Sequence, residues 1–185
     1  MNLHRLVVVS VGALILIFAA PAISGPAKTI PLYGGTESIT IPAGSMLRYK
    51  KVDQDNAVYF DGPVEISGTF YYSENHNDDG VDRGLYVNPD AATIARLPVY
   101  KDHGFADHIY LSNEEAFVKA AISPDKLARL KKDGTHFISG KTDVMADQFT
   151  AGIECDVPNA QAHFLSLVQP RVMAALKNPA EDEGC

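Results

Sequence analysis

Hydrophobic and polar residues alternate most regularly between residues 64 and 72, in the stretch VEISGTFYY. Val64, Ile66 and Tyr72 fall on one side of this pattern, and Tyr71 falls on the other. A period of two that uses β-branched and aromatic residues is typical of a half-buried β-strand. Gly68, inside the pattern, indicates a point where the strand curves. The pattern therefore predicts a bent strand whose two faces differ.

Weaker alternation predicts further strands. They are expected at 38–41, 45–52, 84–87, 108–111, 137–144 and 153–168. The stretch 91–100 is compatible with either a short helix or an irregular strand. Polar and glycine-containing segments separate these runs, as expected for turns between strands.

Helical signals occur mainly between the strands at 108–111 and 137–144. Ser112 and Glu115 have the spacing of a capping box, which predicts a helix start at this point. Ser123 followed by Pro124 predicts a second short helix directly afterwards. The segment 170–176, PRVMAAL, is predicted to form a short terminal helix.

Three strands, a helical segment and two more strands suit a small OB-type barrel. We therefore expect a mainly β fold with one or two helices (α+β), built as an OB-like five-stranded barrel with an N-terminal extended arm. The expected parts are a signal peptide at 1–24, an extension with short edge strands at 25–56, the barrel at 57–168, and a short helix with an acidic tail at 169–185.

Three stretches resemble bacterial exported OB-fold-like domains of unknown function, of the DUF4431 type. VEISGTF at 64–70 looks like their first strand, and FISGKTDV at 137–144 looks like their fourth, where an x-x-G-x-x motif repeats. GIECDV at 152–157 is similar to the end of these domains. The resemblance covers roughly 58–168. It implies an architecture and no catalytic residues, because the family has no well-defined ones to carry over.

The first residues have the layout of a secretory leader. His4 and Arg5 precede an apolar run of about 15 residues, which Pro21 ends. This run is shorter than the roughly 20 residues that span a bilayer, which argues against the alternative of an uncleaved anchor. Small residues before position 25 predict cleavage after Ser24 by the Sec-type route. The mature protein is then expected in the periplasm or secreted, with no membrane span after cleavage.

The length and charge of the chain restrict its domain number and the classes of partner it is expected to bind. The mature chain of about 160 residues suits a single domain. Loss of Arg5 with the leader changes the formal net charge from −7 to −8. Nucleic-acid backbones are bound by clustered Lys and Arg, so this acidic chain is not expected to bind nucleic acid.

Two cysteines, Cys155 and Cys185, are present in a chain expected to meet an oxidising compartment. A disulfide between them would close a loop of about 30 residues and stabilise the fold by about 3–4 kcal/mol in the loop-entropy model. Alternatively, Cys185 stays free on its acidic tail or pairs between chains.

The acidic stretch YYSENHNDDGVDRGLY at 71–86 begins with the spacing of a calcium loop, from Asn75 to Gly80. The twelfth position is Tyr86, where such a loop requires a bidentate glutamate. Two interpretations remain: a solvated loop between strands, or an unorthodox calcium site. The site would use Asp78, Asp79 and Asp82.

Two Asp-His pairs, Asp102-His103 and Asp107-His108, are a second candidate for metal binding or general-base chemistry. A zinc site would need a third ligand from elsewhere in the chain. The alternative is a polar loop before a strand. The candidate metal ligands over both regions are Asp79, Asp82, His103 and His108. No cofactor is otherwise expected.

Signatures of common enzymes are missing from the sequence, including a Gly-x-Ser-x-Gly elbow, a P-loop and a dinucleotide-binding glycine fingerprint. The chain has eight tyrosines, and tyrosines on strands make good recognition surfaces. The sequence therefore favours a binding domain over an enzyme. The candidate binding residues are Tyr71, Tyr72, Asp78, Asp79, Asp82 and Tyr86.

The leading functional hypothesis is an exported non-enzymatic binding domain of the cell envelope. Its partner would be a protein or a small ligand. In one version it is an inhibitor or immunity-type protein for a basic toxin or hydrolase, since complementary charge speeds encounter. One alternative is a metal-binding protein or hydrolase that uses Asp102, His103, Asp107 and His108. Another is an envelope-stress structural module.

Overall fold

The computed structural model describes residues 26–77, 80–133, 137–154, 157–169 and 173–177. At 33, 75–77, 80–82, 131–133 and 173–177 only the backbone is described. In chain order, the elements are β1 (Lys28–Leu32), η1 (Tyr33–Gly35), β2 (Glu37–Ile41), β3 (Arg48–Val52), β4 (Val58–Asp61), β5 (Val64–Asn77), β6 (Gly80–Pro89), α1 (Ala91–Ile94), β7 (Val99–Tyr100), β8 (Ile109–Ser112), α2 (Glu114–Ala121), α3 (Pro124–Asp133), β9 (Phe137–Glu154), β10 (Val157–Leu167) and β11 (Met173–Lys177).

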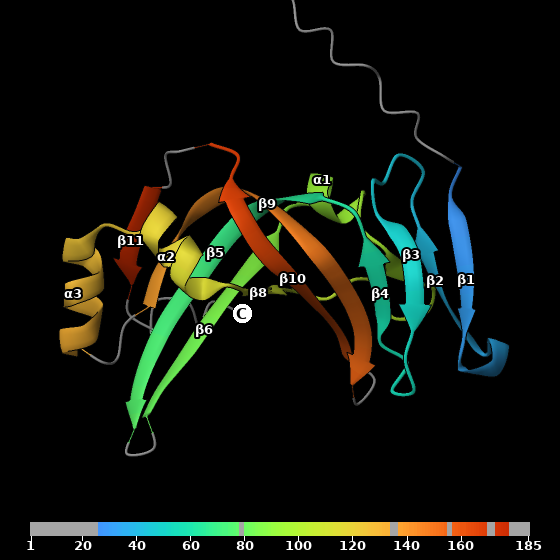
Figure 1. The fold of residues 1–185 in the computed structure, drawn as a ribbon, viewed down its shortest axis with the longest axis horizontal. Helices are drawn as coiled ribbons and strands as arrows, with labels where there is room; N and C mark the ends of the chain where they lie inside the picture. Colours follow the sequence, from blue (N-terminus) through green and yellow to red (C-terminus); the bar gives the residue numbers. More distant parts are fainter. Residues whose placement is uncertain (1–25, 78–79, 134–136, 155–156, 170–172, 178–185) are drawn as a thin grey trace, which may run out of the picture.

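Five strands close into a barrel (Figure 1). β5 pairs with β6 on one side and with β9 on the other, and β6 pairs with β8. β8 lies parallel to β10, and β10 returns antiparallel to β9. The order β5-β6-β8-β10-β9, with helices between the third and fourth strands, is that of an OB-type barrel. The predicted mainly β fold class is confirmed.

Gly68 marks a close approach between β5 and β6. A Cβ atom at this position would lie 2.1 Å from the carbonyl oxygen of Asn88. Beside it, the Thr93 hydroxyl accepts a hydrogen bond from the backbone N–H of Ser67 at 2.9 Å and donates one to the Ser67 carbonyl oxygen at 3.1 Å. The short helix α1 therefore supplies β5 with a side-chain partner where the strand bends.

The N-terminal extension packs against the barrel through two sets of strands. β1, β2 and β7 form a three-stranded sheet, while the β3–β4 hairpin joins the larger sheet through β4 and β9. Ile39 of the extension, Phe60 of β4 and Phe70 of the barrel are buried in one hydrophobic core. The expected extension with short edge strands is therefore part of the same folded body.

Helix α2 covers one region of the barrel through Phe117, which is fully buried. Its ring makes edge-on contacts with Phe70 at 5.0 Å and with Phe164 at 5.3 Å between ring centroids. The predicted capping box is wrong. The N-cap residue is Asn113, in a left-handed conformation without a side-chain cap. Ser112 ends β8, and its hydroxyl is 3.1 Å from Nδ1 of His163 on the neighbouring strand β10.

One further expectation needs correction, and one open alternative is resolved. The stretch 91–100 forms the short helix α1 at 91–94, with Asp90 as its N-cap, and then strand β7 at 99–100. The segment 170–176 was expected to be helical, but 173–177 forms strand β11, antiparallel to the first residues of β9. The edge of β9 at 137–141 lies beyond the end of β10, so its backbone groups can pair with the C-terminal segment.

Candidate functional site

Two adjacent tyrosines of the β5–β6 hairpin lie on opposite faces of the sheet. Tyr71 and Tyr72 follow one another in β5, so their side chains point to opposite faces of the sheet. Tyr71 lies on the outer face, directly opposite Tyr86 of β6. Their rings stack with centroids 5.1 Å apart and an interplanar angle of 13°.

The stacked pair continues across the next strand. Tyr86 is the register partner of Tyr110 in β8, and their ring centroids are 6.1 Å apart. The imidazole of His108 lies 4.8 Å from the Tyr110 ring and 5.2 Å from the Tyr86 ring. On the other side, Phe137 of β9 lies 5.5 Å from Tyr71. We call Phe137, Tyr71, Tyr86, His108 and Tyr110 the aromatic row.

The aromatic row is open to solvent at one end. The Tyr110 side chain is 46% exposed, and the other members are half-buried. Nε2 of His108 lies within hydrogen-bond distance of the Tyr110 hydroxyl oxygen, at 3.1 Å. Cross-strand aromatic pairs stabilise a sheet, and exposed tyrosines also offer a partner a planar apolar surface with a polar hydroxyl. The aromatic row can therefore bind a partner through ring stacking and hydrogen bonds, and neither interaction requires a chemical reaction.

Neutral polar side chains flank the row on the same face. Thr69 and Asn88 are register partners one step along β5 and β6 from Tyr71 and Tyr86. Gln161 of β10 is the register partner of Tyr110 and is exposed. These side chains can donate and accept hydrogen bonds at the edge of an aromatic contact.

The opposite face of the hairpin has different chemistry. Tyr72 points into the barrel with 1% of its surface exposed, and its hydroxyl donates to Oε1 of Glu74 at 2.5 Å. Nε of Arg83, the register partner of Glu74, donates to the same oxygen at 3.3 Å. Burial, followed by the hydrogen bond to Glu74, raises the pKa of Tyr72 above its ordinary value. Tyr72 therefore does not share the outer surface with Tyr71, and its role in ligand or partner binding stays a prediction.

A cavity of about 280 Å³ lies beside this buried group. Its walls come from the inner face of the hairpin and from α2 and α3, and include Glu74, Arg83, Glu115, Val118 and Lys119. The hydrogen bond from Arg83 to Glu74 raises the pKa of the arginine further, so Arg83 stays charged at neutral pH.

The other predicted acidic residues lie at the end of the same hairpin. Asp78 and Asp79 lie outside the described residues, and only the backbone of Asp82 is described. Strand pairing continues on both sides of them, from 75 to 77 and from 80 to 82. Residues 71–77 and 80–86 are therefore paired strands of a hairpin, where the sequence interpretation expected a solvated loop between strands. The metal site at Asp79 and Asp82 stays a prediction.

The two Asp-His pairs do not form one site. Nε2 of His103 lies 3.5 Å from Oε1 of Glu37 on β2, whereas His108 belongs to the aromatic row. No group of three or more His, Cys, Asp or Glu side chains that could hold a metal ion occurs in the described part of the chain, which includes Asp102 and Asp107. The four-residue cluster expected from the sequence is therefore not assembled.

Cys155 and Cys185 both lie outside the described residues, and so does the expected signal peptide at 1–24. The proposed disulfide and the cleavage after Ser24 stay predictions. No described helix has the length and apolar character needed to cross a membrane.

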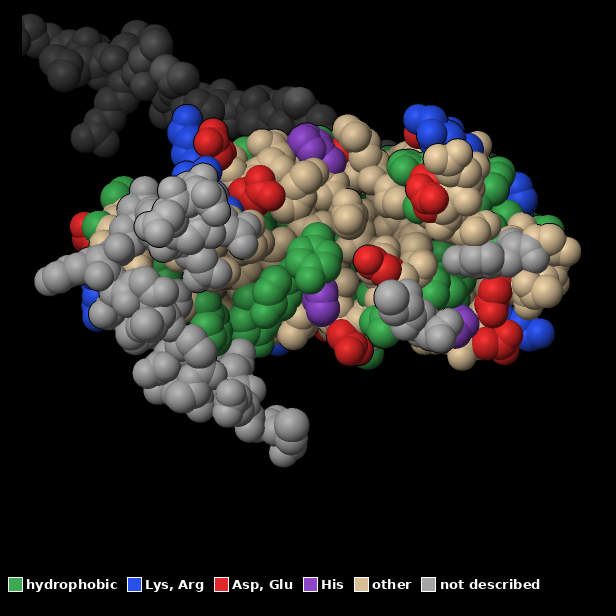
Figure 2. Space-filling model, turned by 90° about the horizontal axis from the view of Figure 1, so that it is seen from below, with side chains coloured by type: hydrophobic (Ala, Val, Ile, Leu, Met, Phe, Trp, Pro, Cys, Tyr) green, Lys and Arg blue, Asp and Glu red, His purple; other side chains and the backbone are tan. Residues whose placement is uncertain are grey.

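Charge is unevenly distributed on the side of the molecule toward which the ends of β5 and β9 point (Figures 1 and 2). Acidic side chains extend across this side, together with hydrophobic ones. Lys and Arg side chains gather mainly toward its two ends (Figure 2). A partner that approaches the middle of this side would meet mostly negative and neutral groups.

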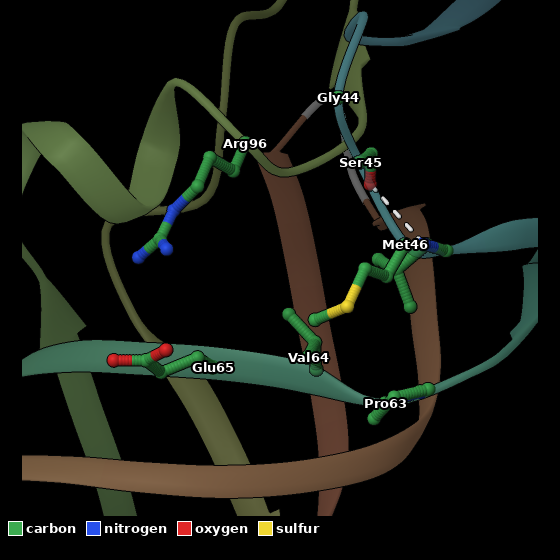
Figure 3. A pocket seen from close by; sticks show the side chains of 8 residues that line it. Gly44, Ser45, Met46, Pro63, Val64, Glu65 and Arg96 are labelled. Atoms are coloured by element: carbon green, nitrogen blue, oxygen red, sulfur yellow. Dashed lines mark hydrogen bonds between the residues drawn. The ribbon is translucent and has the colours of Figure 1, made fainter. Parts of the chain in front are cut away.

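A second, smaller cavity of about 190 Å³ lies where the extension meets the barrel (Figure 3). The Met46 side chain reaches toward Val64, with Arg96 and Glu65 on the other side of the space. The Ser45 hydroxyl accepts a hydrogen bond from the backbone N–H of Leu47 at 3.3 Å. This mainly apolar depression offers little to orient a ligand.

Sequence reasoning missed three members of the aromatic row as parts of one surface: His108, Tyr110 and Phe137. Each is far from Tyr71 in sequence and joins it only through the strand order of the barrel. It also missed the burial of Glu74. The alternation that places Tyr72 inside extends to position 74, and this signal was available.

Comparison with known proteins adds no functional assignment. A scan against protein-family models, a search of curated proteins and a search of solved structures each found no match for this chain. The functional argument therefore depends on the geometry of the site.

Proposed function

We propose that this chain is an exported, non-enzymatic binding domain of the cell envelope. Its recognition surface is the aromatic row, and its partner is a protein with a basic face. In the most specific version it is an inhibitor or immunity-type protein that blocks a basic toxin or hydrolase. The resemblance of 64–70 and 137–144 to exported OB-fold-like domains supports the compartment and the class of fold.

The observation that carries this proposal is the register of three tyrosines. Tyr71, Tyr86 and Tyr110 occupy directly opposed positions on three neighbouring barrel strands. OB-type barrels often bind through the outer face of these strands and through the loop that joins the first two. Tyrosine is enriched at protein interfaces, and a few such residues carry much of the binding energy.

Charge supports a basic partner. The whole chain has a formal net charge of −7, and the β5–β6 hairpin ends in an acidic connection. Opposite charges on two proteins accelerate their encounter and make it sensitive to salt. A negatively charged chain with an aromatic row on its outer face suits a partner that presents Lys or Arg around an apolar patch.

A capture experiment with matched tyrosine variants tests the proposal. The mature protein is immobilised, exposed to envelope extract at low ionic strength, and eluted with high salt. We expect the wild type to retain a basic protein that Tyr110→Ala retains at least about tenfold less, as expected for loss of an interface tyrosine. Tyr49→Ala, a change to a half-buried tyrosine on β3, serves as the control and should retain the partner.

Two outcomes would contradict the proposal. One is that no protein is released by salt from the wild type. The other is that Tyr110→Ala and Tyr49→Ala lose the partner to the same extent, since that result would place the contact away from the aromatic row. Circular dichroism of both variants separates loss of binding from loss of folding.

A further inference from the structure

The cavity behind the β5–β6 hairpin has the features of a small-molecule site. It opens between the inner face of the hairpin and helices α2 and α3, on the face opposite to the aromatic row. Its volume of about 280 Å³ is close to the lower end of the roughly 300–1,000 Å³ typical of ligand pockets. A ligand of amino-acid or dipeptide size would fill it.

The inner wall of the cavity carries a buried charge. The Glu74 side chain is 3% exposed and receives hydrogen bonds from Tyr72 and Arg83. A buried carboxylate is costly unless it is paired, and Tyr72 and Arg83 supply donors that offset this cost. Arg83 is 41% exposed and presents its planar guanidinium at the cavity wall. A guanidinium is well shaped to bind a carboxylate.

The opening of the cavity carries a second pair of opposite charges. Glu115 and Lys119 are four residues apart on α2 and therefore lie on the same side of the helix. Both are exposed, and neither forms an ion pair within the part of the chain that the structure describes. The Glu115 carboxylate contributes to the raised pKa of Arg83, so the electrostatic field of Glu115 reaches the Arg83 guanidinium.

The remaining wall is apolar. Val118 of α2 and Leu127 of α3 are half-buried and line the cavity. They give a small aliphatic group a surface on which to pack. The charged groups that line the cavity are two carboxylates and two cations, so the lining as a whole is neutral.

From these features we infer that the cavity binds a small zwitterion, an amino acid or dipeptide with an aliphatic side chain. Its carboxylate would pair with Arg83 and Lys119, and its ammonium group with Glu115 near Glu74. Its side chain would pack on Val118 and Leu127. A purely structural role explains the cross-strand pair of Glu74 and Arg83. It does not explain the open volume or the unpaired charges at its opening.

A titration followed by NMR tests this inference. The isotope-labelled mature protein is titrated with L-leucine and with L-alanyl-L-leucine. We expect saturable shifts of backbone amides at 72–74, 83–85 and 115–127. Leucinamide lacks the carboxylate and N-acetyl-leucine lacks the ammonium group, and each should bind at least about tenfold more weakly because one charged contact is lost.

Matched variants locate the site. Lys119→Gln and Glu115→Gln should each weaken binding of the zwitterions at least about fivefold, because each removes one charged contact at the opening. Glu114→Gln on α2 and Lys126→Gln on α3 make the same changes outside the cavity lining and should leave binding unchanged. Glu115 and Lys119 are exposed and Glu114 and Lys126 are half-buried, so the four variants are expected to fold.

Three results would overturn the inference. They are no saturable shift with either zwitterion, equal binding of the blocked analogues, and equal affinity in the Lys119→Gln and Lys126→Gln variants. The site is independent of the proposed protein-binding surface. Tyr110→Ala should keep the leucine-induced shifts, so failure of one proposal is distinguishable from failure of the other.

Discussion

The two faces of the β5–β6 hairpin use the same strands for different purposes. On the outer face Tyr71 stacks on Tyr86 in a partly exposed, neutral aromatic row. On the inner face Tyr72 is buried and hydrogen-bonded to Glu74 beside a cavity. Because side chains alternate along a strand, a shift of one residue would exchange these two surfaces. Register therefore decides which tyrosine a partner could reach.

The largest expected difference between the faces is at the adjacent tyrosines. Tyr72→Ala removes a fully buried ring and should reduce the free energy of unfolding by about 3–5 kcal/mol. Tyr71→Ala removes a half-buried cross-strand stack and should cost about 1 kcal/mol. Urea unfolding followed by circular dichroism measures both. Equal losses of stability for the two variants would contradict the assignment of Tyr72 to a buried face and of Tyr71 to a partly exposed one.

Gly68 and Gly84, on the two strands of the hairpin, offer a second comparison. Gly68→Ala places a methyl group against the Asn88 carbonyl oxygen and should destabilise the fold by about 1–3 kcal/mol, because backbone must move. At Gly84, on the outer face, a Cβ would lie 3.2 Å from the Ser73 hydroxyl oxygen, which can rotate away. Gly84→Ala should therefore change stability by less than about 0.5 kcal/mol. Thermal unfolding of the two variants measures both changes in stability. A larger loss for Gly84→Ala than for Gly68→Ala would contradict the prediction.

Glutamates on the two faces should differ as well. Glu74→Gln replaces a carboxyl group that accepts hydrogen bonds from Tyr72 and Arg83, and should reduce the free energy of unfolding by about 1–2 kcal/mol. Glu65→Gln changes a partly exposed carboxylate on the outer face of β5 and should lie within about 0.5 kcal/mol of wild type. Denaturant titration at neutral pH checks both values. An unchanged midpoint for Glu74→Gln would mean that the buried charge contributes nothing to stability.

The smallest effect is expected where the hairpin ends at Asp90. Hydrogen bonds from Thr93, first from its backbone N–H, lower the pKa of Asp90 below its ordinary value of 3.8. A lowered pKa in the folded state means that Asp90 stabilises the fold above about pH 4, and that this contribution is lost as pH falls through the folded value. Asp90→Ser keeps a helix cap without the charge. The urea midpoint of this variant should therefore fall less between pH 6 and pH 3 than the midpoint of the wild type. This pH range includes the ordinary pKa of an aspartate.

Local pattern predicted much of the barrel because the determining contacts are short in sequence. The alternation at 64–72 fixed the bent strand β5, the glycine at its bend and the inward direction of Tyr72. The same pattern separates Tyr72 from Tyr71, and the structure places Tyr72 on the inner face, beside the cavity. Extending the same parity by two positions would have placed Glu74 inside.

Long-range pairing could not be predicted in the same way. Tyr110 reaches Tyr86 only because β8 lies beside β6, and Phe137 reaches Tyr71 only because β9 lies beside β5. Residues 173–177 have the composition of a helix, yet an open strand edge in β9 satisfies their backbone. In each case the deciding contact is with a segment that a local window does not include.

Strand β9 has a consequence for the order of folding. Its early residues pair with β5 and β11, while its last residues pair with β4 and β10. Val58 of β4 therefore meets its partner, Ala151, only after most of the chain has been synthesised. Such distant pairings slow folding, because loop closure precedes the contacts that reward it. Chains released before β9 is complete would expose β4 and β5 as open edges, so premature termination in this region should yield aggregation rather than a smaller stable domain.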